Sequence, residues 1–366
     1  MEKSLHTLFA EVDDPRVVSR CQHKLSDILF IAISTLICNG EDFEDMVEFA
    51  HQRCDWLTEI LELPNGIPSH DTFNRVLQLI NPQALQKCLQ TDGQALLDTL
   101  NEKQINVDGK KLRGVSPTSK GNEGLYILSA WVSENQLCAG QRKVEEKSNE
   151  ISAIPELLNS LEIAGAVVSI DALGCQKKVA AYIADRQAEY LLSLKKNQQQ
   201  TFEDVEDSFR FAEQTDYYQD REYDHGRYER RHCSVVKLSE AAPNETFRDW
   251  KDLRYLIRIQ ASRQTSKGNS QQTRYYLSNA PQGSAAYFNM LVRGHWSIEN
   301  QLHWHLDVTF REDDCRARSL NAPENLNILR KIALQRISQM KDRLSKKKRR
   351  YRASLNNEYL KQVLNF

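Results

Sequence analysis

The segment from residue 104 to residue 195 constrains the fold most, because strand-like and helix-like patterns follow one another along it in a clear order. Alternating apolar residues predict strands, and amphipathic spacing predicts helices. The predicted strands cover residues 104–108, 125–133, 136–144, 165–171 and 190–195, and the predicted helices cover residues 149–163 and 175–186. Three strands, a helix, a strand, a helix and a final strand are typical of a mixed sheet with helices on its faces, so the predicted fold class is α/β.

The first hundred residues have a different texture and predict a helical domain. An apolar helix is expected over 25–39 and an acidic amphipathic helix over 43–61, and two more helices begin near Ser69 and Pro82. The polar residues of 68–80 are of the kinds that reach base edges, so this segment could be a DNA recognition helix. An ordinary amphipathic helix of a small bundle explains the same pattern.

A polar stretch over residues 196–283 separates the last predicted strand from the C-terminal part of the chain. Short strand-like pieces occur in it at 233–238, 253–259 and 274–278, so we predict a β-rich insertion rather than a continuation of the sheet. A final helix is expected over 321–344. The expected domains are residues 1–100, residues 101–345 with the insertion at about 196–283, and a basic C-terminal tail at 346–366.

The net charge of −1 hides a segregation of charge along the chain. Residues 41–62 carry eight acids against one arginine, whereas residues 341–352 carry eight lysines and arginines against one aspartate. The basic segment, which runs into the C-terminal tail, predicts one of two things. It is either a grip on the phosphate backbone of DNA or a flexible, solvated tail.

Cysteine usage and hydropathy indicate a cytoplasmic protein. The eight cysteines include no Cys-x-x-Cys pair and no zinc-like spacing, which is typical of reduced thiols in the cytosol. The longest apolar run, residues 28–38, is too short to span a bilayer, so we expect no membrane association. It does not follow a basic segment at the N-terminus, and no signal peptide is expected.

Two aspartates, Asp108 and Asp171, each end a predicted apolar strand, and Glu299 lies on a helical segment further along the chain. One acid after a strand is most often a turn residue or a helix cap, but sites also assemble at strand ends in open sheets. If the strands are neighbours and the helix packs over them, three carboxylates converge and repel one another unless cations bind. Carboxylate oxygens favour Mg²⁺ or Mn²⁺, and two such ions can clamp the attacking and leaving oxygens of a phosphoryl transfer.

Apolar and aromatic residues are concentrated around this glutamate. Ile298, Leu302 and Leu306 recur every four residues, which indicates one buried helical face. Trp296 and Trp304 are expected to anchor the core. Stacking on a flipped or unpaired base is the alternative for both tryptophans.

Histidines follow the same four-residue spacing on a neighbouring face. His295, Glu299 and His303 form the pattern His-x-x-x-Glu-x-x-x-His, which places three possible zinc ligands in one row. Histidines in such a row more often form hydrogen bonds or contact phosphate. Both interpretations place these side chains close to Glu299.

Several segments of the chain resemble those of bacterial insertion-sequence transposases of the DDE class, close to the H-repeat-associated proteins. They are NVDGKKLRG (106–114), SIDALGCQKK (169–178), YLLSLKKNQ (190–198), HGRYERR (225–231) and RGHWSIENQLHWHLDVTFREDDCR (293–316). The predicted N-terminal helices also resemble the domain that accompanies this catalytic core, so the resemblance covers nearly the whole chain. It implies an RNase H-like mixed sheet with flanking helices, a β-rich insertion between the second aspartate and the glutamate, and a helical N-terminal domain that binds DNA.

The resemblance also implies an activity. Asp108, Asp171 and Glu299 would be the catalytic residues and would bind Mg²⁺ or Mn²⁺, with two ions in one site. The enzyme would cut DNA at the terminal inverted repeats of an insertion sequence and join the freed ends to target DNA. Because two ends must be held together, a homodimer is expected, located in the cytoplasm and at the nucleoid when bound to DNA.

The basic groups around the glutamate depart from the pattern of many relatives, which have a tyrosine and an arginine before it and a lysine after it. Val292, His295 and Leu306 stand at those places. Arg293 and His295 would supply the phosphate contact instead, and Arg311, Arg316 or Arg318 the later basic group. The full set of expected DNA contacts is Lys110, Lys111, Arg227, Arg230, Arg293, His295, His303, Arg311 and Arg316.

Two other functions fit the same residues. A nuclease of the same fold would hydrolyse DNA without joining it. A decayed or domesticated relative would bind DNA through its helices and basic tail without cutting it. Intact acids at all three positions argue against decay.

Overall fold

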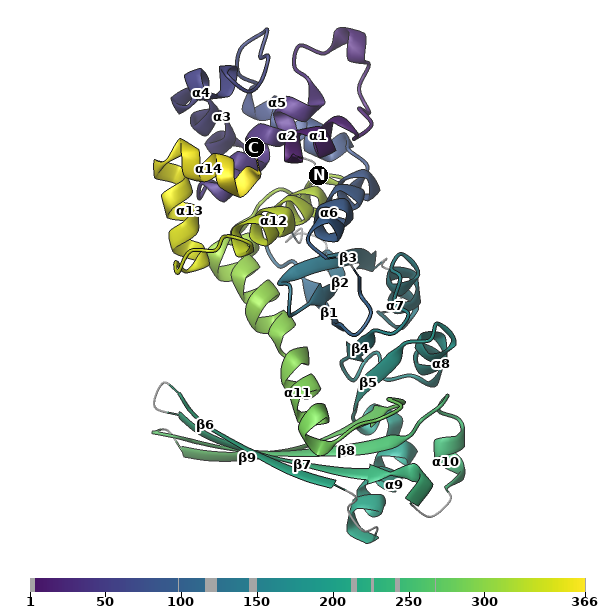
Figure 1. Ribbon diagram of the computed structural model, residues 1–366. Coiled ribbons are helices and arrows are strands. Elements are labelled where there is room, and N and C mark those ends of the chain that lie inside the picture. The colour runs from purple at the N-terminus through teal and green to yellow at the C-terminus, as the bar shows by residue number, and fades with distance from the viewer. Residues whose placement is uncertain are drawn as a thin grey trace.

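The computed structural model describes residues 4–97, 99–115, 124–144, 150–211, 216–224, 227–240, 244–266 and 268–365. Within these residues nine strands form one sheet in the spatial order β3-β2-β1-β4-β5-β9-β8-β7-β6 (Figure 1). The strands are β1 (Gln104–Lys111), β2 (Tyr126–Val132), β3 (Leu137–Val144), β4 (Val167–Ile170), β5 (Glu189–Leu194), β6 (Asp216–Asp224), β7 (Arg227–Lys237), β8 (Tyr255–Thr265) and β9 (Gly268–Ser278).

The first five strands form the predicted mixed sheet. β1 pairs antiparallel with β2, β2 pairs antiparallel with β3, and β4 lies parallel to both β1 and β5. Helices connect the parallel strands and cover the sheet. The arrangement confirms the predicted RNase H-like α/β fold.

The two faces of this sheet are covered by different helices. The helices concerned are α7 (Glu150–Asn159), α8 (Lys177–Asp185), α9 (Gln199–Phe211), α10 (Glu245–Arg248) and α11 (Ala285–His295). Successive side chains of a strand point to opposite faces, so Val168 and Ile170 of β4 join the core under α7 and α8, whereas Val167 packs with α11. β4 is therefore buried on both sides, which explains its unbroken apolar sequence.

The insertion extends the same sheet, and the prediction that it does not continue the sheet is wrong. β9 pairs antiparallel with β5, from Leu191 opposite Ser278 to Leu194 opposite Tyr275. Near this junction the strands are buried, but the far half of β9 is exposed. The exposed halves hide the alternation in the sequence, and β6 and α9 were not predicted. Short 3₁₀ turns, η2 (Lys196–Gln198) and η3 (Leu238–Glu240), flank these elements.

The N-terminal residues form the four predicted helices, one of them divided in two, and two short helical elements precede them. The elements are α1 (Leu5–Ala10), η1 (Val18–Arg20), α2 (Leu25–Ile37), α3 (Phe43–Gln52), α4 (Cys54–Thr58), α5 (His70–Leu79) and α6 (Pro82–Ala95). The helix expected over 43–61 is divided at Arg53. In α5, the possible recognition helix, Phe73, Val76 and Leu77 are buried whereas His70 and Arg75 are exposed, as in any amphipathic helix.

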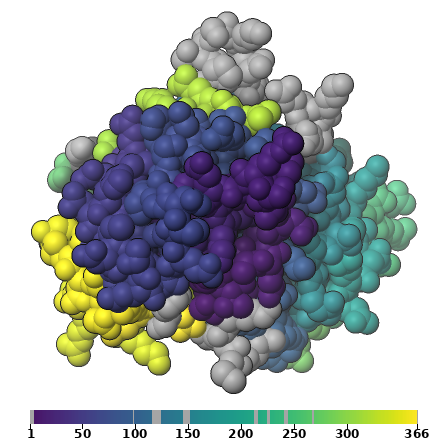
Figure 2. Space-filling view, turned by 90° about the horizontal axis from the view of Figure 1, so that it is seen from above, coloured from purple at the N-terminus to yellow at the C-terminus, as the bar shows by residue number. Residues whose placement is uncertain are grey.

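This helical core is completed by the other end of the chain. α12 (Ala322–Ser338), α13 (Lys346–Leu355) and α14 (Asn357–Leu364) share one apolar cluster with α1 to α6. Figure 2 shows the C-terminal helices, in yellow, against the N-terminal helices, in purple and blue. The final helix was expected over 321–344, but α12 ends at Ser338 and two more helices, α13 and α14, follow it.

The basic segment after α12 is not the flexible, solvated tail that was one of its two interpretations. Arg349 and Arg350 are buried in α13. The Arg350 guanidinium donates to the carbonyl oxygens of Leu36, at 2.7 and 3.1 Å, and Thr309. The segment thus joins the two ends of the chain, while Lys347 and Lys348 remain exposed on its outer side. Among the described residues there is no helix with the length and apolarity needed to cross a membrane.

Candidate functional site

The site forms where β1, the end of β4 and one long helix meet. After α11 the helix continues as two π-helical stretches, η4 (Ile298–His303) and η5 (His305–Thr309). Ile298, Leu302 and Leu306 are buried on one side of it, as predicted. A step of four residues overshoots an α-helical turn by about 40°, so this spacing is better suited to a widened helix. π-Helical turns are frequent at functional sites.

Strand register brings the two aspartates to neighbouring positions. Val107 of β1 is opposite Ile170, the last residue of β4. The next residue after each of them is an aspartate, Asp108 after Val107 and Asp171 after Ile170. Asp108 does not end its strand as predicted, because β1 continues to Lys111 on its pairing with β2. Asp108 therefore projects from a strand whose neighbour on one side has already ended.

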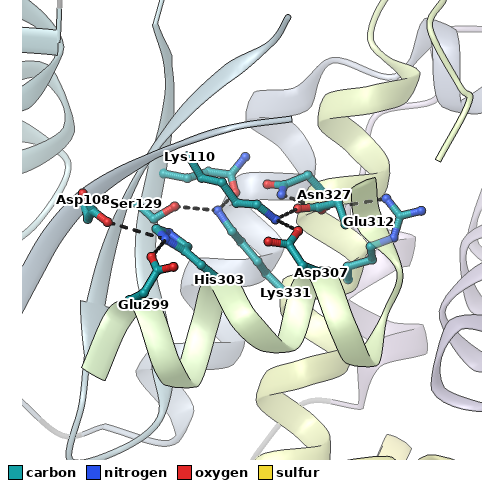
Figure 3. Close-up of polar contacts among 11 residues, drawn as sticks. Asp108, Lys110, Ser129, Glu299, His303, Asp307, Glu312, Asn327 and Lys331 are labelled. Atoms are coloured by element: carbon teal, nitrogen blue, oxygen red, sulfur yellow. Dashed lines mark hydrogen bonds and ion pairs between the residues drawn. The ribbon is translucent and has the colours of Figure 1, made fainter. Parts of the chain in front are cut away.

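The helix adds Glu299 and His303 to this position (Figure 3). His303 Nδ1 lies 3.2 Å from Glu299 Oε2 and 3.5 Å from Asp108 Oδ2. Ligand atoms of Asp108, Glu299 and His303 all lie within 4.8 Å of one another. Asp171 is outside this group, and its Oδ1 accepts backbone N–H bonds from Leu173 and Gly174 at 3.1 and 3.5 Å.

The electrostatics of the group favour a bound cation. Burial raises the pKa of the Asp108 carboxyl to about 6, and the charges of Asp171 and Glu299 push it the same way against the opposing effect of His303. The hydrogen bond with His303 holds the pKa of Glu299 below its ordinary value. Gathered carboxylates with this repulsion form a donor set that suits a hard divalent ion.

A cavity of about 520 Å³ opens in front of the three acids. Asp108, Asp171 and Glu299 all line it. Its wall also carries Lys195 and Lys196, which directly follow β5, and Arg274 from β9. These three basic residues were not among the predicted contacts. The two lysines lie in the quoted segment YLLSLKKNQ, whereas Arg274 comes from the insertion and needed the fold to reach the site.

Several predicted DNA contacts are engaged in ion pairs. Arg293 pairs with Glu222, at 2.8 Å, and with Asp220. Other pairs join Arg227 to Glu229 at 2.8 Å, and Arg311 to Glu41 at 3.1 Å and to Asp314 at 3.0 Å. Lys111 and Arg316 are exposed and Arg230 is half-buried, while His225 of the quoted segment HGRYERR lies outside the described residues.

The two histidines of the predicted row have separate environments. His295 is buried with its Nδ1 3.0 Å from Ser169 Oγ, and burial lowers its pKa to about 4. Among the described residues, the group that could hold a metal contains His303 but not His295. The row of three ligands that would bind zinc is therefore not formed.

The two tryptophans near Glu299 are not core anchors, contrary to the prediction. Trp296 and Trp304 are 43% and 50% exposed. The guanidinium of Arg274 lies 4.4 Å from the centre of the Trp296 ring, a cation–π contact at the edge of the cavity. Stacking on a base, the alternative interpretation, stays a prediction.

A buried network beside the acids involves a residue that was expected to contact DNA. Lys110 Nζ donates to Glu312 Oε2 at 2.8 Å and to Asp307 (Figure 3). Its side chain is 11% exposed and that of Glu312 is 1% exposed. Lys110 is thus an internal ion-pair partner in this structure rather than a surface group. Glu312, which lies in the short 3₁₀ helix η6 (Glu312–Asp314), was not predicted, although it lies in the quoted segment around Glu299.

Comparisons with known proteins match both parts of the chain. A family model described as the transposase DDE domain matches residues 102–336, and a model described as DDE_Tnp_1-associated matches residues 6–91. The chain is 35% identical to a putative transposase YncI of Escherichia coli O157:H7, over 99% of this chain and 94% of that one. It is also 35% identical to the H repeat-associated putative transposase YhhI of Escherichia coli K12, over 99% and 98%.

Proposed function

We propose that this chain, which belongs to the transposase DDE domain family, is a metal-dependent enzyme that cuts DNA at insertion-sequence ends and joins the freed 3′-ends to target DNA. Family membership supports a role as a DNA transposase. The observation that carries the proposed chemistry is the convergence of Asp108, Asp171 and Glu299 on one cavity.

The acids fit a divalent cation by their chemistry. Asp108 and Glu299 approach closely enough to share an ion, and Asp171 follows the neighbouring strand in register with Asp108. All three offer carboxylate oxygens, the donors that Mg²⁺ and Mn²⁺ prefer. When bound, such ions would stabilise the negative charge on the attacking and leaving oxygens of the phosphoryl transfer.

The chain's own residues would hold the DNA in place for this reaction. Lys195, Lys196 and Arg274 put positive charge on the wall of the same cavity, where phosphate groups would lie beside the acids. Trp296, under Arg274, offers an aromatic surface at the cavity edge. The predicted contacts that are ion-paired, such as Arg293, would have to exchange their carboxylate partners for phosphate.

The proposed partners are DNA and a second copy of the chain. Terminal inverted repeats would bind first, and target DNA would then enter the same cavity. A homodimer follows from the chemistry, because two element ends must be cut and joined together. The N-terminal helices and the exposed lysines of α13 are the proposed surfaces for repeat binding.

A strand-transfer assay with Mg²⁺ or Mn²⁺ tests this proposal. The substrate is a duplex that ends in the inverted repeat found in the DNA flanking the coding sequence. Asp108→Asn and Asp171→Asn keep the side-chain shape and remove the charge, so both are expected to abolish cleavage and joining. Asp249→Asn, at an exposed ion pair with Lys177, is the matched control and is expected to stay active.

Two results would contradict the proposal. Full activity of Asp171→Asn would remove that residue from the site. Cleavage without joined products from the unmodified protein would favour the nuclease alternative, because only a transposase joins the cut strand to a second DNA.

A further inference from the structure

The side chain of His303 occupies a central position among the proposed metal ligands. It is buried, with 5% of its side chain exposed, whereas 60% of the Glu299 side chain is exposed. One nitrogen, Nδ1, faces both Glu299 Oε2 at 3.2 Å and Asp108 Oδ2 at 3.5 Å (Figure 3). The imidazole thus links a glutamate on an open helix surface to an aspartate on a central strand.

The other ring nitrogen indicates where the imidazole carries its proton. Nε2 of His303 is buried, and no described residue forms a hydrogen bond with it. A buried N–H without an acceptor is unfavourable, whereas a bare ring nitrogen leaves no donor unsatisfied. The imidazole therefore carries a hydrogen on Nδ1, and this N–H donates to Glu299 and points towards Asp108. A nitrogen that donates to the carboxylates cannot also coordinate their cation.

We propose that His303 is a positioning residue that joins Glu299 to Asp108 through its Nδ1–H and so assembles the cation site before a cation binds. An exposed glutamate has many side-chain conformations, and only some of them direct its carboxylate at Asp108. The hydrogen bond from His303 selects among them. The inference rests on the proposed function only in that these carboxylates bind a divalent ion.

Three substitutions separate this role from others. Asparagine places its amide nitrogen where histidine has Nδ1, so His303→Asn retains the donor. Glutamine places its amide nitrogen near the position of Nε2, so His303→Gln leaves the carboxylates without a donor at the Nδ1 position. His303→Ala removes the donor altogether. The matched control is His305→Asn on the same helix, because His305 Nδ1 contacts Thr309 Oγ1 at 2.9 Å and none of the acids.

Calorimetric titration of the full chain with MgCl₂ and with MnCl₂ measures the effect. Loss of an orienting hydrogen bond typically weakens metal binding by about 10- to 100-fold, which is the loss expected for His303→Ala and His303→Gln. His303→Asn is expected to recover most of it, and His305→Asn to bind like the unmodified protein. Circular dichroism of each variant checks that it is folded, and the asparagine and glutamine variants remain comparable if the alanine variant unfolds.

Several results would overturn the inference. Equal affinity of the asparagine and glutamine variants would show that the donor position is irrelevant. In electron spin-echo spectra of the Mn²⁺-bound protein, a nitrogen coupling that disappears in His303→Asn would make His303 a ligand instead. If the unmodified protein binds the ion and His303→Ala binds it equally well, this inference alone fails. If the unmodified protein binds no ion, the proposed function fails with it.

Discussion

Lys110→Met should destabilise the protein strongly, although the residue is a lysine beside a proposed DNA site. Its ammonium lies 2.8 Å from the carboxylate of Glu312, and the Glu312 side chain is almost fully buried. Removing one partner of a buried ion pair costs about 3–5 kcal/mol, because the other charge stays buried. Glu312 keeps a hydrogen bond from Asn327 at 2.8 Å and the charge of Arg330 at 3.8 Å, so we expect the lower end, about 3 kcal/mol.

The pH dependence of this loss has a defined sign. Burial raises the pKa of Glu312, but the charges of Lys110 and Arg330, with hydrogen bonds from Lys110 and Asn327, hold it below its ordinary value. Its ionised form therefore stabilises the folded state at neutral pH, and this contribution is lost as the pH falls. In Lys110→Met burial dominates and raises the pKa of Glu312, so the folded state is penalised at neutral pH. The gap between the two proteins should be widest at neutral pH and narrow below about pH 5.

Urea unfolding at several pH values measures the effect. The double variant Lys110→Met/Glu312→Gln should recover part of the loss, because no buried charge remains without its partner. Lys103→Met, at the residue before β1, is the matched control. Its ion pair with Glu134 is exposed, and pairs of this kind contribute about 0–1 kcal/mol. A loss for Lys110→Met no larger than that for Lys103→Met, or one that does not change with pH, would refute the reasoning.

Three further changes have expected outcomes. Gly114→Ala would bring the new Cβ to 2.4 Å from two backbone carbonyl oxygens, so it should lower stability by about 1–3 kcal/mol. In the control Gly93→Ala, in α6, the nearest atoms to the new Cβ are 3.7 Å away. Equal melting temperatures of the two variants would contradict this. Arg350→Met should release α13 from its contacts and speed the cleavage of this helix by trypsin. The side chain of Arg352 is half exposed, so Arg352→Met should not speed cleavage. Unchanged cleavage of Arg350→Met would show that other contacts hold the helix. Because burial raises the pKa of Asp108 to about 6, protons should compete with Mg²⁺ below that pH, and the affinity measured by calorimetry should weaken there. A constant affinity from pH 5 to 8 would exclude Asp108 as a ligand.

The candidate site could be predicted in part because its acids follow locally readable patterns. Asp108 and Asp171 come after apolar residues that alternate as strands do, and Glu299 lies beside a regular apolar row. The register between β1 and β4, with Val107 opposite Ile170, then makes the two aspartates neighbours. Pairing of this kind depends on hydrogen bonds between distant segments, so the sequence could suggest the convergence but not establish it.

Charged residues were the least predictable part of the site. Lys110 was expected to contact phosphate, and Arg350 was part of a segment for which a solvated tail was one interpretation. Arg350 is buried and the Lys110 side chain is only 11% exposed, because each has a partner far away in the chain. Glu312 is 202 residues from Lys110, and Leu36 is 314 residues from Arg350. A charged side chain can be buried only where such a partner compensates its lost hydration. Residue type and spacing contain no information about that partner.

By itself, the sequence determined the order of the first five strands and the helices between them, and the acids worth testing, since burial leaves an apolar pattern in these elements. Only the tertiary structure decided that β9 continues the sheet beyond β5 and that the chain's last helices complete the first core. It also placed His303 between Asp108 and Glu299. These features depend on which segments meet in space, and that choice is made by the packing of the whole chain rather than by any single stretch of it.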